Sequence, residues 1–200
     1  MLKIHAEPFL DFIVLERLNK NYGSEALARG EQLNQLLINL NNKDVQTQLL
    51  EVNRFFNRFT HKFDDEVWGE SDYWATPEEF IGLKTGDCED YVIAKYFTLR
   101  ELGVPDEQLK ITYVKAVQLN QAHMVLAYYP EPGAEPLILD NLVDEILPAS
   151  QRKDLVPVYS FNGEGLWLSK LSSQEGKRIG NADKLESWKE NMTRHYRLFE

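Results

Sequence analysis

The stretch Thr85-Gly86-Asp87-Cys88-Glu89-Asp90-Tyr91, with the amphipathic segment after it, decides the fold. Cys88 is the only cysteine of the 200-residue chain. A glycine-bearing turn ends here, and the pattern predicts a helix from this point to about Leu102, stopped by Gly103-Val104-Pro105. The thiol would then lie at a helix N-terminus, where unpaired backbone N–H groups and the helix dipole stabilise a thiolate.

Two polar residues downstream complete a candidate catalytic set with Cys88. His123 opens a strand-like apolar run, and Asp140 closes another. Cysteine, histidine and aspartate follow in the order expected when a helix-borne nucleophile faces a sheet that carries its base and the base's orienting residue. Each also has a plainer interpretation, as a buried cysteine, a structural histidine and a turn-forming aspartate. Asn141 is the alternative orienting residue, but Asp140 follows the apolar run directly and is preferred.

Three acids flank the thiol, and their negative charges should raise its pKa. One interpretation is that Asp87, Glu89 and Asp90 point into solvent and cap the helix, where negative charge is favourable. The other is a bound cation, because Asp87 and Asp90 are spaced to share a helix face. Calcium prefers such oxygen ligands, and further carboxylates stand in the preceding connector: Asp64, Asp65 and Asp72. The residues alone leave both interpretations open.

The remaining chain reads as helices first and strands second. Helices are predicted at residues 9–18, 25–40, 45–59, 77–83 and 88–102, and the fourth opens with the capping box Thr76-Pro77-Glu78-Glu79. Strands are predicted at 110–119, 123–129, 136–139, 157–161 and 166–169, the last two joined by Asn162-Gly163-Glu164-Gly165. We expect an α+β fold in one catalytic domain, 1–200: a helical lobe at 1–103, an antiparallel β-sheet lobe at 104–181 and a C-terminal helix at 182–200.

Composition narrows the classes of function. At 43% hydrophobic and 12% aromatic residues, the chain can bury one sizeable core. A net charge of −10 argues against a nucleic-acid partner, and no apolar run approaches the roughly 20 residues that span a bilayer. A single cysteine excludes an internal disulfide and a thiolate-rich zinc site. The first residues lack a signal-peptide pattern, so we expect either a cytosolic protein or a processed form.

Four segments resemble those of the bacterial transglutaminase-like cysteine proteinases, and among these the LapG-type periplasmic proteases. They are Asp72-Tyr73-Trp74-Ala75-Thr76-Pro77-Glu78-Glu79, Gly86-Asp87-Cys88-Glu89-Asp90-Tyr91, His123-Met124-Val125-Leu126 and Leu139-Asp140-Asn141. The resemblance implies a papain/transglutaminase-like fold, with Cys88 as nucleophile, His123 as base and Asp140 as orienting residue. It also implies Ca²⁺ as cofactor, with these residues at the metal site: Asp87, Glu89 and Asp90, and Asp72 as a further candidate.

The same resemblance implies a biological role. Enzymes of this type are periplasmic endopeptidases that cut the N-terminal region of a large surface adhesin near a pair of alanines, which releases biofilms. Their inhibitory partner is the periplasmic domain of an inner-membrane receptor for cyclic di-GMP. Two other functions fit the same residues. One is a transglutaminase-like acyltransferase or deamidase, and the other is a non-catalytic calcium-binding adaptor domain.

Overall fold

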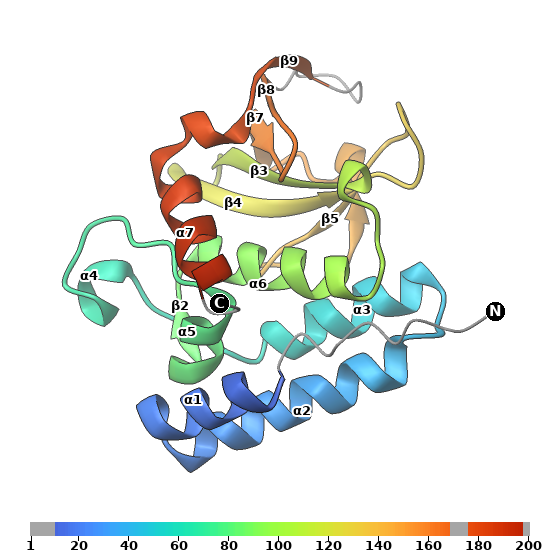
Figure 1. The fold of residues 1–200 in the computed structure, drawn as a ribbon. Coiled ribbons are helices and arrows are strands. Elements are labelled where there is room, and N and C mark those ends of the chain that lie inside the picture. Colours follow the sequence, from blue (N-terminus) through green and yellow to red (C-terminus); the bar gives the residue numbers. More distant parts are fainter. Residues whose placement is uncertain (1–10, 169–175, 198–200) are drawn as a thin grey trace.

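The computed structural model describes residues 11–168 and 176–197. Its elements lie in three layers (Figure 1): a seven-stranded sheet, the helix α6 (Cys88–Glu101) beneath it, and the helices of the N-terminal half beneath α6. This arrangement confirms the α+β class and the order of helices before antiparallel sheet.

The N-terminal layer contains α1 (Phe12–Tyr22), α2 (Ser24–Leu40) and α3 (Val45–Phe56). Asp11 and Asp44 cap α1 and α3, each accepting a backbone N–H at 2.9 Å. α1 begins at Phe12, after its cap Asp11, and ends at Tyr22 rather than at the predicted residue 18; the predicted residues 9 and 10 lie outside the described part. The predicted end at Phe59 was also wrong, because α3 stops at Phe56 and the chain turns toward the first short strand.

The connector between α3 and α6 contains short elements that the sequence did not reveal. The two-residue strands β1 (Thr60–His61) and β2 (Thr85–Gly86) pair in parallel, and α4 (Asp64–Val67) forms a single turn. Such short segments have no period to detect. By contrast, α5 (Pro77–Leu83) has the predicted bounds, with the Thr76 capping box formed. β2 leads directly into α6, so the connector positions the N-terminus of that helix.

The sheet has the order β6-β5-β4-β3-β7-β8-β9, with antiparallel neighbours throughout. Its strands are β3 (Leu109–Ala116), β4 (Gln121–Tyr128), β5 (Leu137–Leu139), β6 (Leu147–Pro148), β7 (Leu155–Phe161), β8 (Leu166–Leu168) and β9 (Lys177–Gly180). The short strands β6 and β9 were not predicted. β4 begins at Gln121 rather than at His123, since the turn is completed at Asn120, whose φ is +51°.

One cluster of buried apolar side chains joins the helices to the lower face of the sheet. α6 lies inside this cluster, and its Val92, Ile93 and Leu99 are fully buried. The last helix, α7 (Glu186–Arg197), follows a turn at Ala182–Lys184 and inserts Trp188 against Phe161. The helix predicted at 182–200 therefore begins only at Glu186, and its predicted residues 198–200 lie outside the described part. α6 is therefore covered on several sides, and its N-terminus is held in a fixed place.

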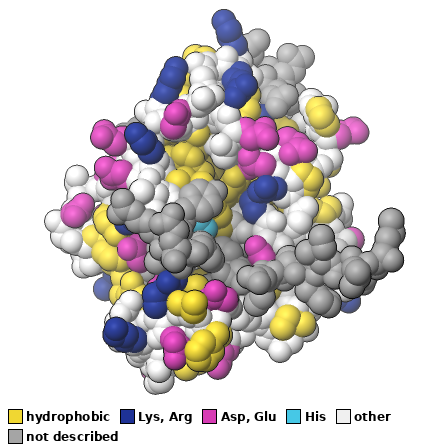
Figure 2. Space-filling model, in the orientation of Figure 1, with side chains coloured by type: hydrophobic (Ala, Val, Ile, Leu, Met, Phe, Trp, Pro, Cys, Tyr) yellow, Lys and Arg dark blue, Asp and Glu magenta, His cyan; other side chains and the backbone are white. Residues whose placement is uncertain are grey.

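The surface gives two further findings. Among the described residues, none of the helices combines the length and apolar character needed to cross a membrane. On the face shown in Figure 2, acidic and basic side chains alternate over the surface, and the basic ones do not merge into a continuous area.

Candidate active site

Cys88 is the first residue of α6, as the sequence predicted. The turn before it is tight, because a Cβ added to Gly86 would lie 2.1 Å from Asp90 Oδ2. That same oxygen accepts the backbone N–H of Asp87 at 3.2 Å, and Asp90 Oδ1 accepts the backbone N–H of Ala75 at 2.7 Å. Asp90 is thus buried in the turn rather than pointing into solvent, and it fixes the start of the helix.

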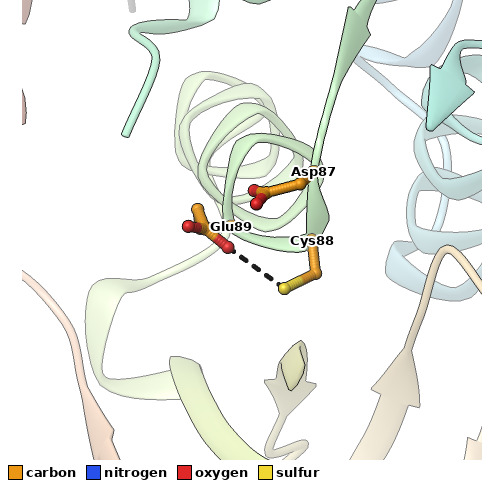
Figure 3. Close-up of side chains that lie close together, drawn as sticks. All are labelled: Asp87, Cys88 and Glu89. Atoms are coloured by element: carbon orange, nitrogen blue, oxygen red, sulfur yellow. Dashed lines mark hydrogen bonds between the residues drawn. The ribbon is translucent and has the colours of Figure 1, made fainter. Parts of the chain in front are cut away.

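The thiol of Cys88 donates a hydrogen bond to Glu89 Oε2, with a sulfur–oxygen distance of 3.1 Å (Figure 3). Burial raises the pKa of the thiol well above its usual value, and the charges of Glu89 and Asp87 raise it further. The backbone N–H of Met124 hydrogen-bonds the sulfur and opposes this shift. The sulfur therefore lies beside β4, at the residue next to His123.

His123 and Asp140 form a buried pair. Their Nε2 and Oδ1 atoms are 2.7 Å apart, and the residues are 2% and 0% exposed. Burial raises the pKa of Asp140, but hydrogen bonds from His123, Leu142 and Arg152 outweigh it and lower the pKa to about 2. Asp140, and not the alternative Asn141, makes this contact. Because Nε2 is engaged, Nδ1 is the ring atom available to exchange a proton with a substrate or a thiol.

Five carboxylates gather at the N-terminus of α6. Three sets of side chains each bring ligand atoms within 4.8 Å of one another: Asp87, Cys88 and Glu89; Asp64, Asp87 and Asp90; and Asp64, Asp72 and Glu89. In Figure 3 the carboxylates of Asp87 and Glu89 lie on the same side of the helix start. The structure thus brings the predicted Asp87, Glu89, Asp90 and Asp72 together. Asp65, the other connector candidate, is exposed and belongs to none of these sets.

The electrostatics of this cluster fit a cation. Burial, followed by repulsion between neighbouring acids, raises the pKa of Asp87 and Asp90; burial also raises that of Asp64 and Glu89. Asp64 Oδ1 and Asp87 Oδ1 are buried and have no hydrogen-bond partner among the described residues. Buried carboxylate oxygens without partners are costly unless a positive charge meets them. The donor set is all oxygen apart from the Cys88 sulfur, as calcium prefers.

One residue of the site, Asp64, received too little weight from the sequence, and another, Arg152, was not indicated by it. Asp64 appeared only as one of several connector acids, yet it is 3% exposed and belongs to two of the three sets. Arg152 was not singled out at all. Its Nη2 donates to Asp140 Oδ2 at 2.7 Å, from the loop between β6 and β7. In the sequence, Arg152-Lys153-Asp154 reads as an ordinary charged surface run, and no local signal marks it.

The comparisons with known proteins agree with this geometry. The profile of the family described as bacterial transglutaminase-like cysteine proteinase matches residues 20–169. Among solved structures, Legionella pneumophila LapG is 46% identical, with a TM-score of 0.79 over 90% of this chain and 97% of that one. The EGTA-treated form of that protein gives 46% and 0.80 over the same shares. The calcium-bound form gives 47% and 0.78 over 90% and 96%. No curated protein sequence gave a match.

Both the family profile and the likeness in structure extend over most of the described elements, from the helical layer to the sheet. They confirm the transglutaminase-like fold expected from the sequence. The catalytic roles of Cys88, His123 and Asp140 and the metal roles of the acids stay predictions. The chain belongs to the bacterial transglutaminase-like cysteine proteinase family.

Proposed function

We propose that this protein is a calcium-dependent cysteine endopeptidase with Cys88 as nucleophile, His123 as base and Asp140 as orienting residue. The observation that carries the proposal is the 2.7 Å contact between His123 and Asp140. The residue after His123, Met124, directs its backbone N–H to the Cys88 sulfur, so this pair lies beside the thiol. Membership in a family of cysteine proteinases supports the same assignment.

The proposed reaction is acyl transfer to water. His123 takes the thiol proton at Nδ1, and the thiolate attacks the peptide carbonyl carbon, moving the C=O electron pair to oxygen. The Cys88 backbone N–H, at the first position of α6, donates to this oxyanion. As the tetrahedral species collapses, His123 gives its proton to the departing amine. Water then loses a proton to His123 and attacks the thioester, which frees the acid product and regenerates the thiol.

The acid cluster gives calcium its place in this proposal. Asp87, Glu89 and Asp90, with Asp64 and Asp72, would hold the ion. Bound calcium supplies positive charge beside residues whose own charges raise the pKa of the Cys88 thiol. Solved structures of the LapG relative in calcium-bound and EGTA-treated forms support a calcium site in this family.

We also propose the role that LapG-type enzymes imply. The substrate would be the N-terminal region of a large surface adhesin, cut near a pair of alanines in the periplasm to release a biofilm. The periplasmic domain of an inner-membrane cyclic di-GMP receptor would act as inhibitor. The 46% identity to LapG over 90% of this chain supports this extension.

The test uses the calcium-loaded protein and a purified adhesin N-terminal fragment that contains a pair of alanines. We expect one cleavage at that pair, identified by mass spectrometry, and none with Cys88→Ala or with a fragment whose alanines are replaced by arginines. EGTA should stop the cleavage, and added calcium should restore it.

Other outcomes would point to the other functions. Cleavage that survives in Cys88→Ala would contradict the nucleophile assignment. Incorporation of an amine into a glutamine substrate without cutting of the backbone would favour an acyltransferase. Absence of both reactions, together with failure of iodoacetamide to label Cys88 in the calcium-loaded protein, would favour a non-catalytic domain.

A further inference from the structure

Arg152 is a buried cation that lies behind the candidate catalytic pair. Arg152 is 5% exposed, and its guanidinium group contacts two carboxylates. Nη2 donates to Asp140 Oδ2 at 2.7 Å and to Asp154 Oδ2 at 2.8 Å, while Nε donates to Asp154 Oδ1 at 3.0 Å. The two bonds to Asp154 are bidentate, the geometry that fixes the plane of a guanidinium group. Asp154 thus orients Arg152, and Arg152 in turn meets Asp140.

The contacts of Asp140 show what Arg152 contributes. Oδ1 accepts from His123 Nε2 and from the backbone N–H of Leu142, at 2.7 and 3.0 Å. Oδ2 accepts from Arg152 Nη2 at 2.7 Å. Two anchored oxygens set the carboxylate plane, whereas one leaves it free to rotate about its bond to Cβ. The orientation of the His123 ring therefore depends on a contact made on the far side of Asp140.

The main chain at Asp140 is held separately. Asn57 Nδ2 donates to the Asp140 carbonyl oxygen at 2.8 Å, and Lys95 Nζ donates to Asn57 Oδ1 at 2.7 Å. Asn57 Nδ2 also donates to Asp144 Oδ1, at 2.7 Å. These contacts place the backbone but leave the Asp140 carboxylate to its own partners. Loss of Arg152 should thus disturb the carboxylate without moving the strand end.

We propose that Arg152 is a positioning residue for the reaction. By anchoring Asp140 Oδ2 it keeps the carboxylate turned toward His123, and so it holds the imidazole with its proton on Nε2 and its lone pair on Nδ1. The inference rests on the proposed function for its catalytic consequence, but the state of the imidazole can be measured without any substrate. Arg152 is buried behind Asp140, so its loss should lower kcat and leave KM nearly unchanged.

The first experiment reads His123 directly. In calcium-loaded protein with ¹⁵N-labelled histidine, His123→Gln identifies the His123 ring signals. We expect wild-type spectra with Nε2 protonated and Nδ1 unprotonated. Arg152→Ala should give a mixture of the two tautomers or broadened signals. Lys153→Ala is the matched control, because it removes an exposed cation at the next position. An unaltered His123 spectrum in folded Arg152→Ala would overturn the proposal.

The second experiment asks whether a guanidinium group can be returned. Arg152→Ala should lower kcat on the adhesin fragment roughly 10- to 100-fold, the range found when outer groups that orient ligating histidines are removed. Free guanidinium, kept too dilute to unfold the protein, should restore part of that loss in Arg152→Ala and leave wild type and Lys153→Ala unchanged. Failure of rescue, together with a wild-type kcat, would again overturn the proposal.

Two further variants cover the case in which Arg152→Ala fails to fold. Arg152→Lys keeps the charge but provides a single nitrogen, so it should show a partial change in the His123 signals. Asp154→Asn weakens the bidentate contact and should shift the signals in the same direction by less. Wild-type spectra in both would refute the role of Arg152. If wild-type protein cleaves no fragment, the proposed function fails, while the histidine spectra still decide the positioning role.

Discussion

The hydrogen bond from Cys88 to Glu89 shows how acidic residues control the candidate nucleophile. A thiol that donates to a carboxylate keeps its proton, and the raised pKa of Cys88 has burial and these same acids as its causes. Burial and the acids therefore outweigh the helix N-terminus, which the sequence suggested would lower the pKa of the thiol. On the proposed function, activation would require that the acids be neutralised, which would link the reactivity of the thiol to calcium binding at the acid cluster.

The first prediction concerns the pH dependence of stability without calcium. Asp87 and Asp90 have pKa values raised in the folded state, so between the unfolded and folded values the folded protein binds more protons. Their stabilising contribution is present below the unfolded pKa and is lost as pH rises through the folded pKa. We expect the free energy of unfolding in EGTA, measured by urea denaturation, to fall between about pH 5 and pH 8.

Two controls isolate this effect. Asp87→Asn should flatten the pH dependence in EGTA, because it removes one of the charges that repel each other. Calcium should raise the free energy of unfolding most at the upper end of the pH range, where the acids are ionised. If wild type and Asp87→Asn showed the same slope, the acid cluster would not be the source of the pH dependence.

At the scale of elements, α7 supports the acid cluster from outside. Asn191 Nδ2 donates to the carbonyl oxygens of Trp74 and Ala75 at 2.8 and 2.9 Å. Ala75 in turn donates its N–H to Asp90, and Tyr73 donates its N–H to Asp64 Oδ2 at 2.6 Å. The segment 72–75 thus connects the last helix to two of the buried acids. The contacts of Asn191 are not visible in the sequence, since its partners lie 116 and 117 residues away.

The second prediction tests that support. Asn191→Ala leaves the Ala75 carbonyl oxygen without its donor, while Arg194 still donates to the Trp74 carbonyl oxygen, and should destabilise the protein by about 1–3 kcal/mol. It should also weaken calcium binding, measured by isothermal titration calorimetry, because segment 72–75 would lose one of its two anchors on α7 and be held less firmly against Asp90. Glu190→Ala, at an exposed position of the same helix, is the control. Unchanged calcium affinity in Asn191→Ala would show that α7 serves stability alone.

The third prediction concerns Lys95, in the middle of α6. Its side chain is fully buried, and burial lowers its pKa to about 7, against a smaller opposing effect from Asp140 and Asp144. Between this pH and the unfolded value near 10.4, the unfolded chain binds more protons. Stability contributed by this site should therefore rise with pH over that window, by at most about 1.4 kcal/mol per pH unit.

Lys95→Met provides the measurement. The difference in free energy of unfolding between wild type and Lys95→Met should increase in favour of wild type as pH rises from about 7 to 10. Comparing the two proteins in the same buffer cancels the opposite pH dependence of the free energy of unfolding that the acid cluster contributes to both. Lys153→Met, at an exposed lysine, should show no such trend. A flat difference for Lys95→Met would mean that Lys95 stays charged in the folded protein.

For the whole molecule, the features predicted correctly depend on local chemistry. The capping box at Thr76 fixed α5 because its partners are three residues apart. The apolar run before Asp140 placed its carboxylate at the strand end, where Oδ1 lies 2.7 Å from His123 Nε2. The hairpin at 162–165 likewise joins β7 to β8. In each case the deciding interactions lie within a few residues or follow from side-chain alternation.

The features that were missed depend on distant parts of the chain. β6 and β9 exist because β5 and β8 offer free edges, and their own sequences carry no period. Asp64 joins the acid cluster only because α4 folds back on the start of α6. Arg152 reaches Asp140 across the sheet edge from a loop that looks like solvent-exposed chain in the sequence. These contacts arise from how elements are assembled, so one sequence read locally cannot supply them.

The first and last helices of the described chain converge on one short stretch, residues 72–83. Arg17 of α1 pairs with Glu78 at 2.8 Å, the ring of Tyr22 packs against Gly82, and α7 holds the carbonyls of Trp74 and Ala75. Removal of either helix by another protease should therefore disorder the segment that leads to Cys88, while the candidate residues Cys88, His123 and Asp140 remain uncut. Cleavage within either helix should then weaken the structure around Cys88 before any of these three residues is itself degraded.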